Sequence, residues 1–276
     1  MLPGELPISS KAQNLAKHSL NDWRQWQLPF HSRPKIVEQL EGGLTNSSFV
    51  IASGSQRAVL RVNNPEADKL GVNRQTEITI FKQLQSTELV PRLYFADSHF
   101  LVSEYIDGVV LDDGKVTDPS VSKQIEQAIA VIQNQAIADI EVRNYQAYVL
   151  GYCDQLSSQY LDKSIRQSLL QIARDIDAQD WNPVICHHDL IPENIILSSC
   201  GLRIIDWEYA AVGHPQFDYL RLTNSHHIMD VPPNICELQA LQASLIHLWY
   251  AIRYPELRGT VQHKLLKIID TVGVKS

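Results

Sequence analysis

Three oxygen-bearing side chains stand at fixed intervals in one short stretch of this chain. Asp189 is followed five residues later by Asn194, and Asp206 ends an apolar run. The apolar runs 195–197 and 202–205 predict two short strands, because a Ser-Ser-Cys-Gly turn separates them. Such a hairpin would bring Asn194 and Asp206 together at one end, with Asp189 on the loop that leads in. This set suits Mg²⁺-assisted phosphoryl transfer, since a hard cation prefers oxygen ligands and the nucleophile needs a proton acceptor.

Each of these residues also has a structural interpretation. An Asp or Asn in a loop commonly caps a helix or closes a turn. The run His187-His188-Asp189 is also compatible with a transition-metal site. Adjacent side chains point in different directions, however, which disfavours that alternative. The three oxygen-bearing residues taken in order therefore favour phosphoryl transfer.

Composition limits the fold and the partners. The chain has 276 residues, of which 44% are hydrophobic and 20% charged, so it can bury the core of one large domain or of two lobes. Lys and Arg total 24 against 31 Asp and Glu, a net charge of −7 that disfavours nucleic acid and suits a cationic substrate. The four cysteines form no CxxC pair, and we find neither a signal peptide nor an apolar run of membrane-spanning length. We expect a soluble cytoplasmic protein without membrane insertion; its oligomeric state stays open.

The pattern His-x-Asp-x-x-x-x-Asn, followed by a strand that ends in Asp, resembles a family motif. It is similar to that of the kinase-like small-molecule phosphotransferases, namely aminoglycoside phosphotransferases, choline/ethanolamine kinases and thiamine kinases. The phrase GLRIIDWEYA is especially similar to bacterial thiamine and choline kinases. The resemblance implies Asp189 as catalytic base, Asn194 and Asp206 as Mg²⁺ ligands, and His187 as a brace of the loop. Asp218 resembles the buried Asp that begins the next helix and supports the catalytic loop.

In the N-terminal part, apolar runs predict strands at 35–40, 48–52 and 58–62, with a glycine-containing segment between the first two. Glycines let a backbone approach a phosphate closely, although the segment taken alone is better explained as an ordinary hairpin with a glycine bulge. The segment lacks the P-loop pattern but resembles the GG-x-TN loop of choline kinases, which covers the nucleotide phosphates. The resemblance assigns the following residues to nucleotide binding: Gly43, Thr45, Asn46 and Ser47.

A basic residue and an acidic residue complete the implied nucleotide site. Arg61 lies in the third strand, where kinase-like folds place the cation that binds the α- and β-phosphates, and arginine can bind phosphate bidentately. Glu77 lies in a predicted helix, 73–85, and by resemblance pairs with Arg61. An exposed strand arginine and a solvated glutamate are the alternatives. The backbone from Glu104 to Ile106, after the strand that begins at Phe100, is the expected hinge and adenine-binding segment.

The substrate side is less sharply defined. Glu208 lies two residues beyond Asp206, so we expect it to face the cleft or its rim, beside Trp207. Trp249 and Tyr250 lie in a predicted helix, 237–252, and aromatic faces bind delocalised cations. Taken singly, however, each aromatic residue is better explained by core packing. The Asn-His-x-x-Glu pattern of eukaryotic choline kinases is not found after Asp218, which weakens a strict choline assignment.

These observations predict an α+β, two-lobed protein-kinase-like fold with an antiparallel N-lobe sheet and a mostly helical C-lobe. We divide it into a nucleotide-binding lobe, 1–106, with a helix at about 9–28, and a catalytic lobe, 107–276. The implied activity is ATP- and Mg²⁺-dependent transfer of the γ-phosphate to a cationic alcohol such as thiamine or choline/ethanolamine. An aminoglycoside is the alternative acceptor, and a catalytically silent nucleotide-binding protein is the alternative function. Protein kinase activity is disfavoured, since His188 replaces the Arg of HRD and Trp207-Glu208 replaces the FG of DFG.

Overall fold

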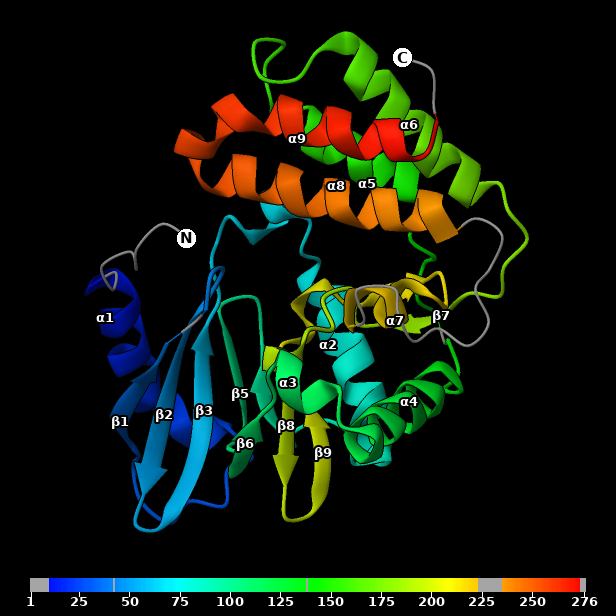
Figure 1. The fold of residues 1–276 in the computed structure, drawn as a ribbon. Coiled ribbons are helices and arrows are strands. Elements are labelled where there is room, and N and C mark those ends of the chain that lie inside the picture. The colour runs from blue at the N-terminus through cyan, green and yellow to red at the C-terminus, as the bar shows by residue number, and fades with distance from the viewer. Residues whose placement is uncertain (1–9, 42, 138, 223–234, 274–276) are drawn as a thin grey trace.

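The computed structural model describes residues 10–41, 43–137, 139–222 and 235–273. It contains an N-terminal lobe built on a sheet and a larger C-terminal lobe built mostly of helices (Figure 1). The predicted two-lobed kinase-like fold is confirmed, including the antiparallel order β1-β2-β3-β5-β4 of the N-terminal sheet. Its strands are β1 Lys35–Leu40, β2 Ser47–Ser53, β3 Gln56–Val62, β4 Leu93–Ala96 and β5 Phe100–Glu104.

The two faces of β3 serve different purposes. In β3, Ala58 and Leu60 are fully buried on one face, against helix α1 (Ser10–Ser19) and the 3₁₀ helix Leu20–Gln25. Arg61 points to the opposite face, because successive strand side chains alternate. The strand therefore uses one face for the core and presents its arginine on the other.

The N-terminal helix is shorter than predicted. The expectation was a helix at about 9–28, whereas α1 ends at Ser19 and a 3₁₀ helix follows to Gln25. Ser19 bonds through its hydroxyl to the carbonyl oxygen of Ala16, and Asn21-Asp22 follow at once. Such short polar side chains compete with the helix backbone for hydrogen bonds, which accounts for the change of helix type.

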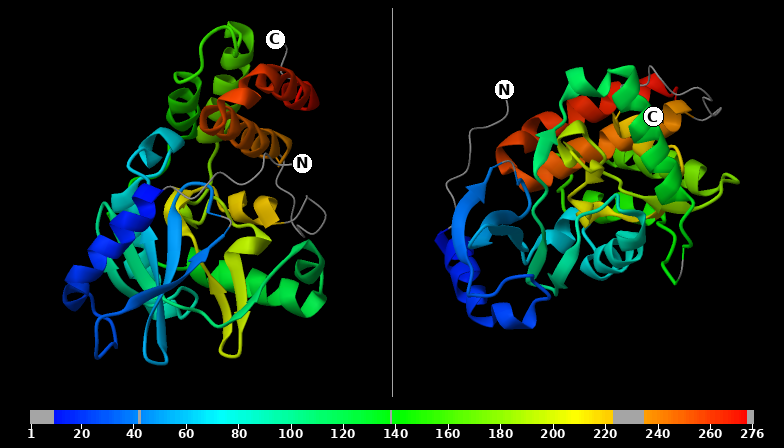
Figure 2. Two further views of the ribbon diagram at one scale, coloured as in Figure 1. Left: turned by 90° about the vertical axis from the view of Figure 1, so that its left-hand side faces the viewer. Right: turned by 90° about the horizontal axis from the view of Figure 1, so that it is seen from below.

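The C-terminal lobe consists of a helical bundle and a smaller group of strands. Helices α5, α6, α8 and α9 stack on one another at the top of Figure 1, and the N-terminal sheet lies below them in the side view of Figure 2. The helices are α3 Asp113–Val116, α4 Pro119–Gln133, α5 Tyr145–Cys153, α6 Lys163–Asp177, α7 Phe217–Leu222, α8 Ile235–Arg253 and α9 Arg258–Thr271. The strands are β6 Gly108–Val110, β7 Val184–Cys186, β8 Ile195–Ser198, β9 Gly201–Ile204 and β10 Ala211–Gly213.

One hydrophobic core is shared between the lobes. Helix α2 (Arg74–Gln83) lies on the sheet and contributes Ile80 and Phe81 to a cluster that also contains Ile204 and Trp207 of the C-terminal lobe. The chain crosses between lobes after β5, because β6 pairs with β8 and not with the N-terminal sheet. The division at residue 106 stays a proposal. None of the helices in the described ranges has both the length and the apolar character needed to span a membrane.

Candidate active site

The loop that carries Asp189 begins at the end of β7 and is fixed by a buried carboxylate. Asp218, in the first turn of α7, is 3% exposed. Its Oδ2 accepts from the backbone N–H of His187 at 2.7 Å, and its Oδ1 accepts from that of His188 at 2.9 Å. His188 has φ 64°, a left-handed conformation that is costly for a residue with a Cβ. Asp218 therefore holds the loop in a conformation that the chain would not adopt unaided.

Replacing Asp218 with alanine is expected to destabilise the protein. Two buried backbone N–H groups would lose their partner, and each unsatisfied group costs about 1–3 kcal/mol. We therefore expect the free energy of unfolding, measured by urea denaturation, to fall by at least about 2 kcal/mol. Asp154→Ala, which removes an exposed carboxylate, is the matched control. Equal stability of both variants would contradict a bracing role for Asp218.

His187 joins the loop of Asp189 to the segment of Asp206. Its Nε2 lies 2.8 Å from the carbonyl oxygen of Ile205, and its Nδ1 accepts from the N–H of Asp189 at 3.3 Å. Burial lowers the pKa of His187, so the ring is neutral, donating through Nε2 and accepting at Nδ1. The imidazole ring of His187 thereby links the backbone of Asp189 to the residue before Asp206.

His188 points away from His187. Its Nε2 lies 3.1 Å from the hydroxyl of Tyr145, which itself accepts from the N–H of His214 at 2.9 Å. Burial lowers the pKa of His188 well below its ordinary value. The two adjacent histidines thus serve separate structural bonds, which speaks against the transition-metal alternative.

The predicted hairpin places Asn194 and Asp206 at the same end. Strands β8 and β9 pair antiparallel, and the N–H of Ile205 donates to the carbonyl oxygen of Asn194 at 2.9 Å. The Asn194 side chain, 8% exposed, donates from Nδ2 to the carbonyl oxygen of Asp189 at 2.9 Å. That bond turns the amide oxygen the opposite way. Asp206 has φ 61°, and its side chain is 41% exposed. An amide oxygen and a reachable carboxylate are a donor set that fits Mg²⁺.

Arg61 connects the N-terminal lobe to Asp206. Its Nη2 lies 2.6 Å from Oε1 of Glu77, and its Nη1 lies 3.5 Å from Oδ1 of Asp206. Its Nε donates to Oδ1 of Asn63 at 3.0 Å. The pairing of Arg61 with Glu77 that the resemblance implies is therefore present. Both side chains are less than a tenth exposed, so the guanidinium has little freedom to turn.

Arg74 belongs to the same network and was not predicted. At the start of α2, its Nη1 lies 2.8 Å from Oε2 of Glu77 and 3.3 Å from Oε2 of Glu208. Its Nη2 donates to Oδ1 of Asn46 at 2.7 Å. The spacing from Arg74 to Glu77 is i, i+3, which is the one signal in the sequence that this pair exists. Glu77 is consequently held between two arginines.

The glycine-containing loop packs on the C-terminal lobe. Asn46 donates from Nδ2 to Oε2 of Glu208 at 2.7 Å, and the hydroxyls of Thr45 and Tyr209 lie 3.5 Å apart. At Gly43 an added Cβ would lie 2.6 Å from the carbonyl oxygen of Asn46, so only glycine fits that turn. Ser47 is the first residue of β2, and Gly42 lies outside the described residues. The predicted loop residues thus lie directly over the segment that follows Asp206.

Two predicted substrate residues are buried instead. Glu208, expected at the cleft or its rim, is 3% exposed and lies beneath the glycine-containing loop, where its carboxylate accepts from Asn46 and Arg74. Trp207 is 2% exposed and donates from Nε1 to the carbonyl oxygen of Ile204 at 2.9 Å. The short helical turn after Asp206 rotates Trp207 into the interlobe core, which gives it a packing role.

The predicted aromatic residues form a cluster on α8. Trp249, Tyr250 and Tyr254 lie with ring centroids 5.1–6.2 Å apart. Trp249 donates from Nε1 to the hydroxyl of Tyr209 at 2.7 Å. Burial raises the pKa of Tyr250. Because Tyr209 lies three residues after Asp206, its bond to Trp249 places the cluster beside the segment that follows Asp206.

Arg221 is the second residue that the sequence did not reveal. From α7 it donates through Nε and Nη2 to Oδ1 of Asp189, both at 3.1 Å. Burial raises the pKa of Asp189 to about 6, and Arg221 partly opposes that rise. Burial likewise raises the pKa of Asp206 to about 6 against the effect of Arg61, and that of Glu208 to about 7 with help from Asp206. Perturbed carboxyl groups gathered in this way are typical of catalytic sites.

The linker between the lobes is held by Arg92 and by Arg57 of β3. The N–H of Glu104 donates to the carbonyl oxygen of Arg92, and its side chain accepts from the N–H of Arg92 at 3.1 Å. Ile106 follows between β5 and β6. Arg57 holds this linker by stacking on Tyr105 at 4.0 Å and pairing with Asp107 at 3.0 Å.

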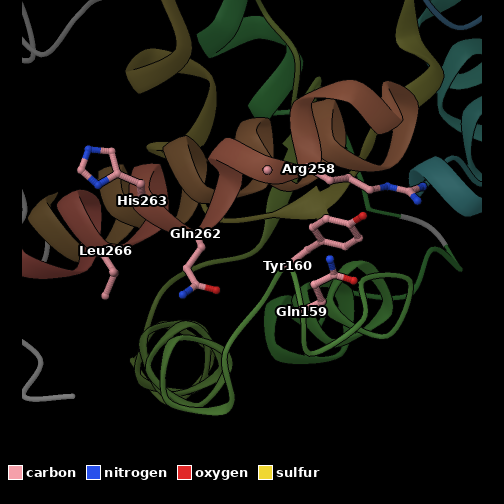
Figure 3. A pocket seen from close by; sticks show the side chains of 7 residues that line it. Gln159, Tyr160, Arg258, Gln262, His263 and Leu266 are labelled. Carbon is pink, nitrogen blue, oxygen red and sulfur yellow. The ribbon is translucent and has the colours of Figure 1, made fainter.

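A separate hollow of about 310 Å³ lies between the α5–α6 connection and α9 (Figure 3). It is lined by the end of the α5–α6 connection and by α9, with Tyr160, Arg258 and His263 among its side chains. It contains none of the catalytic residues predicted from the sequence, so it plays no part in the site.

The comparisons with known proteins agree with this geometry. The family model described as choline/ethanolamine kinase matches residues 37–222. Human ethanolamine kinase 2 is 27% identical over 204 residues, which cover 68% of this chain and 53% of that protein. The chain thus spans about half the length of the first curated relatives that it matches.

Two solved structures illustrate the likeness of fold. Choline kinase LicA from Streptococcus pneumoniae superposes with a TM-score of 0.72 at 21% identity, covering 96% of this chain and all of LicA. A thermostable mutant of the aminoglycoside phosphotransferase APH(4)-Ia, in a ternary complex with ADP and hygromycin B, gives 0.64 at 14% identity, covering 97% of this chain and all of that chain. The match of the family model over most of the chain is decisive: this protein belongs to the choline/ethanolamine kinase family.

Proposed function

We propose that the protein is an ATP- and Mg²⁺-dependent kinase that transfers the γ-phosphate to a hydroxyl of a small alcohol. The observation that carries this proposal is the convergence of Asp189, Asn194 and Asp206. Asn194 is bonded through its side chain to Asp189, and through its carbonyl oxygen to the residue before Asp206. Arg61 reaches Asp206 from the other lobe. Family membership supports the same reaction class.

Each side chain has a role in this reaction. Asp189 accepts the proton of the acceptor hydroxyl. General-base catalysis of this kind raises the rate by about 10²–10⁴-fold. Arg61, aimed by Glu77, binds phosphate oxygens of the nucleotide, and the loop 43–47 covers them. Asn194 and Asp206 would hold Mg²⁺, which when bound neutralises phosphate charge. The linker 104–106 offers backbone groups to adenine, by analogy with the order of elements in kinase-like folds.

The acceptor in this proposal is a cationic alcohol, such as thiamine or choline/ethanolamine. The aromatic cluster of Trp249 and Tyr250, which is bonded to Tyr209 in the segment after Asp206, supports it, because aromatic faces attract cations. The net charge of −7 is in keeping with such an acceptor. A cytoplasmic location forms part of the proposal, supported by four free cysteines, of which Cys153 and Cys186 are buried.

An ATP-consumption screen tests the proposal. With Mg²⁺ present, the protein is assayed against thiamine, choline, ethanolamine and aminoglycosides. Turnover with a cationic alcohol supports the proposed acceptor class. Turnover with aminoglycosides alone would replace it by antibiotic phosphorylation, and nucleotide binding without any turnover would indicate a catalytically silent protein.

The rate is expected to depend on pH in a defined direction. Burial raises the pKa of Asp189 to about 6, so its carboxyl group is protonated below that pH and cannot accept a proton. The value of kcat/KM should therefore fall as the pH is lowered through about 6. Protonation of Asp189 alone lowers kcat/KM by about tenfold for each pH unit below its pKa, and the fall is steeper if Asp206 is protonated over the same range. Steady-state rates from pH 5 to 8 in buffers of constant ionic strength provide the measurement. A profile that stays level to pH 5 would contradict Asp189 as the base.

A further inference from the structure

Within the residues that the structure describes, Arg221 bonds to one carboxylate oxygen of Asp189, the predicted base, and leaves the other oxygen without a hydrogen bond. Both of its hydrogen bonds, from Nε and from Nη2, end on Oδ1 of Asp189 at 3.1 Å. The remaining oxygen, Oδ2, is the one left to accept from an acceptor hydroxyl. The Arg221 side chain is 26% exposed and that of Asp189 is 31% exposed, so a small molecule that reaches Asp189 also meets the guanidinium.

The charges around this pair determine what it attracts. Glu208 is buried beneath Arg74 and Asn46, and its charge is taken up by that network. His187 is neutral. Glu193, in the loop after Asp189, is exposed, so water and salt screen it. Asp206 pairs with Arg61 at 3.5 Å. Among the residues that the structure describes, Asp189 and Arg221 therefore meet an acceptor as a nearly neutral ion pair rather than as a lone carboxylate.

A lone carboxylate would attract an ammonium group held beside the reacting hydroxyl. Choline and ethanolamine carry their nitrogen only an ethylene unit from the oxygen. When the hydroxyl meets Oδ2, this nitrogen therefore stays close to the ion pair, where the carboxylate attracts it and the guanidinium repels it. Like charges at such short separation repel and cancel the attraction of Asp189. In thiamine the positive ring nitrogen lies farther from the hydroxyl and so from the guanidinium. The aromatic cluster is bonded through Trp249 to Tyr209, in the segment after Asp206. Helix α7 lies directly beneath α8 (Figure 1).

We propose that Arg221 is a specificity-determining residue. It disfavours acceptors with a positive charge next to the reacting hydroxyl and admits acceptors whose charge is remote from the hydroxyl or that carry no charge. This inference rests on the proposed kinase function. It narrows the acceptor class to alcohols of the thiamine kind, in which a delocalised cation is remote from the hydroxyl. It also gives Arg221 a role that core packing or loop support would not require.

The test compares two acceptors of the same shape. Choline and neohexyl alcohol differ in that a carbon replaces the charged nitrogen, so the ratio of their kcat/KM values measures the effect of charge alone. The ratio is independent of the fraction of active enzyme. In the wild type we expect no preference for choline. Arg221→Gln should raise the kcat/KM for choline relative to that for neohexyl alcohol by about 10-fold or more, because the carboxylate then acts without its cation.

Two further variants complete the design. Arg221→Lys keeps the charge and should keep the wild-type ratio, although the loss of the two-pronged contact lowers both rates. Arg166→Gln removes one positive charge from α6, where Arg166 pairs with Asp154, and should leave the ratio unchanged.

The outcomes separate the two proposals. A ratio in Arg221→Gln equal to that of the wild type would overturn the role of Arg221 while leaving the kinase function in place. If Arg221→Gln does not fold, the kcat/KM ratio of the wild type still tests the inference. A wild-type preference for choline of about 10-fold or more over neohexyl alcohol would refute the inference. Absence of ATP consumption with every alcohol, thiamine included, would remove the kinase function and this inference with it.

Discussion

Replacing Asp189 with asparagine should reduce kcat by about 10²–10⁴-fold, the usual contribution of a general base. Asparagine keeps the size of the side chain and an oxygen for Arg221, but it cannot take a proton at neutral pH. The backbone carbonyl oxygen that accepts from Asn194 is unchanged by the substitution, so the neighbouring predicted ligand should keep its position. Steady-state turnover with the best acceptor from the screen measures the loss, and calorimetric titration with ADP and Mg²⁺ should show nucleotide binding close to that of the wild type.

Glu193→Gln is the matched control for this prediction. It removes a carboxylate from the same loop, and this residue is exposed. Its effect on Asp189 is a minor one among those that raise the pKa of the base. Turnover of Glu193→Gln should stay near that of the wild type. If Asp189→Asn retains full turnover, or if it loses nucleotide binding and turnover together, Asp189 is not the base.

The sequence predicts those parts of the site that depend on local order. The hairpin of β8 and β9 follows from two short apolar runs and a turn, and it sets Asn194 beside the backbone of Ile205. Alternation in β3 likewise predicts that Arg61 leaves the core face. Both results depend on neighbours a few residues apart, for which periodicity and turn chemistry are sufficient.

Contacts between distant segments could not be predicted in this way. Arg221 meets Asp189 across 32 positions of sequence, and Arg74 meets Glu208 across 134. No local pattern encodes such distances, since they depend on how α2 and α7 pack against the catalytic loop. The same cause explains Trp207 and Glu208. Their closeness to Asp206 suggested a place at the substrate, whereas the turn that follows Asp206 sends one into the core and the other beneath Asn46.

Replacing Asp206 with asparagine should reduce kcat/KM by about 10²–10³-fold at ordinary Mg²⁺ concentration, since a lost metal ligand removes several kcal/mol of charge stabilisation. The side chain is 41% exposed and its bond to Arg61 is long, 3.5 Å, so a cation can reach the carboxylate. The concentration of Mg²⁺ that gives half-maximal rate should rise, and added Mg²⁺ should recover part of the activity. Asp154→Asn, an exposed carboxylate paired with Arg166, is the control and should keep the wild-type Mg²⁺ dependence.

A second interpretation of the Asp206 variant has to be separated from metal binding, because Asp206 also touches Arg61. Arg61 is held far more tightly by Glu77, at 2.6 Å, and by Asn63, at 3.0 Å. Loss of the long bond to Asp206 should therefore leave its orientation unchanged. Binding of ATP in the presence of EDTA should be the same in Asp206→Asn and the wild type, and it should weaken in Glu77→Gln. An Asp206 variant with an unchanged Mg²⁺ requirement but weaker metal-free ATP binding would show that Asp206 acts through Arg61, and the proposed magnesium site would have to be abandoned.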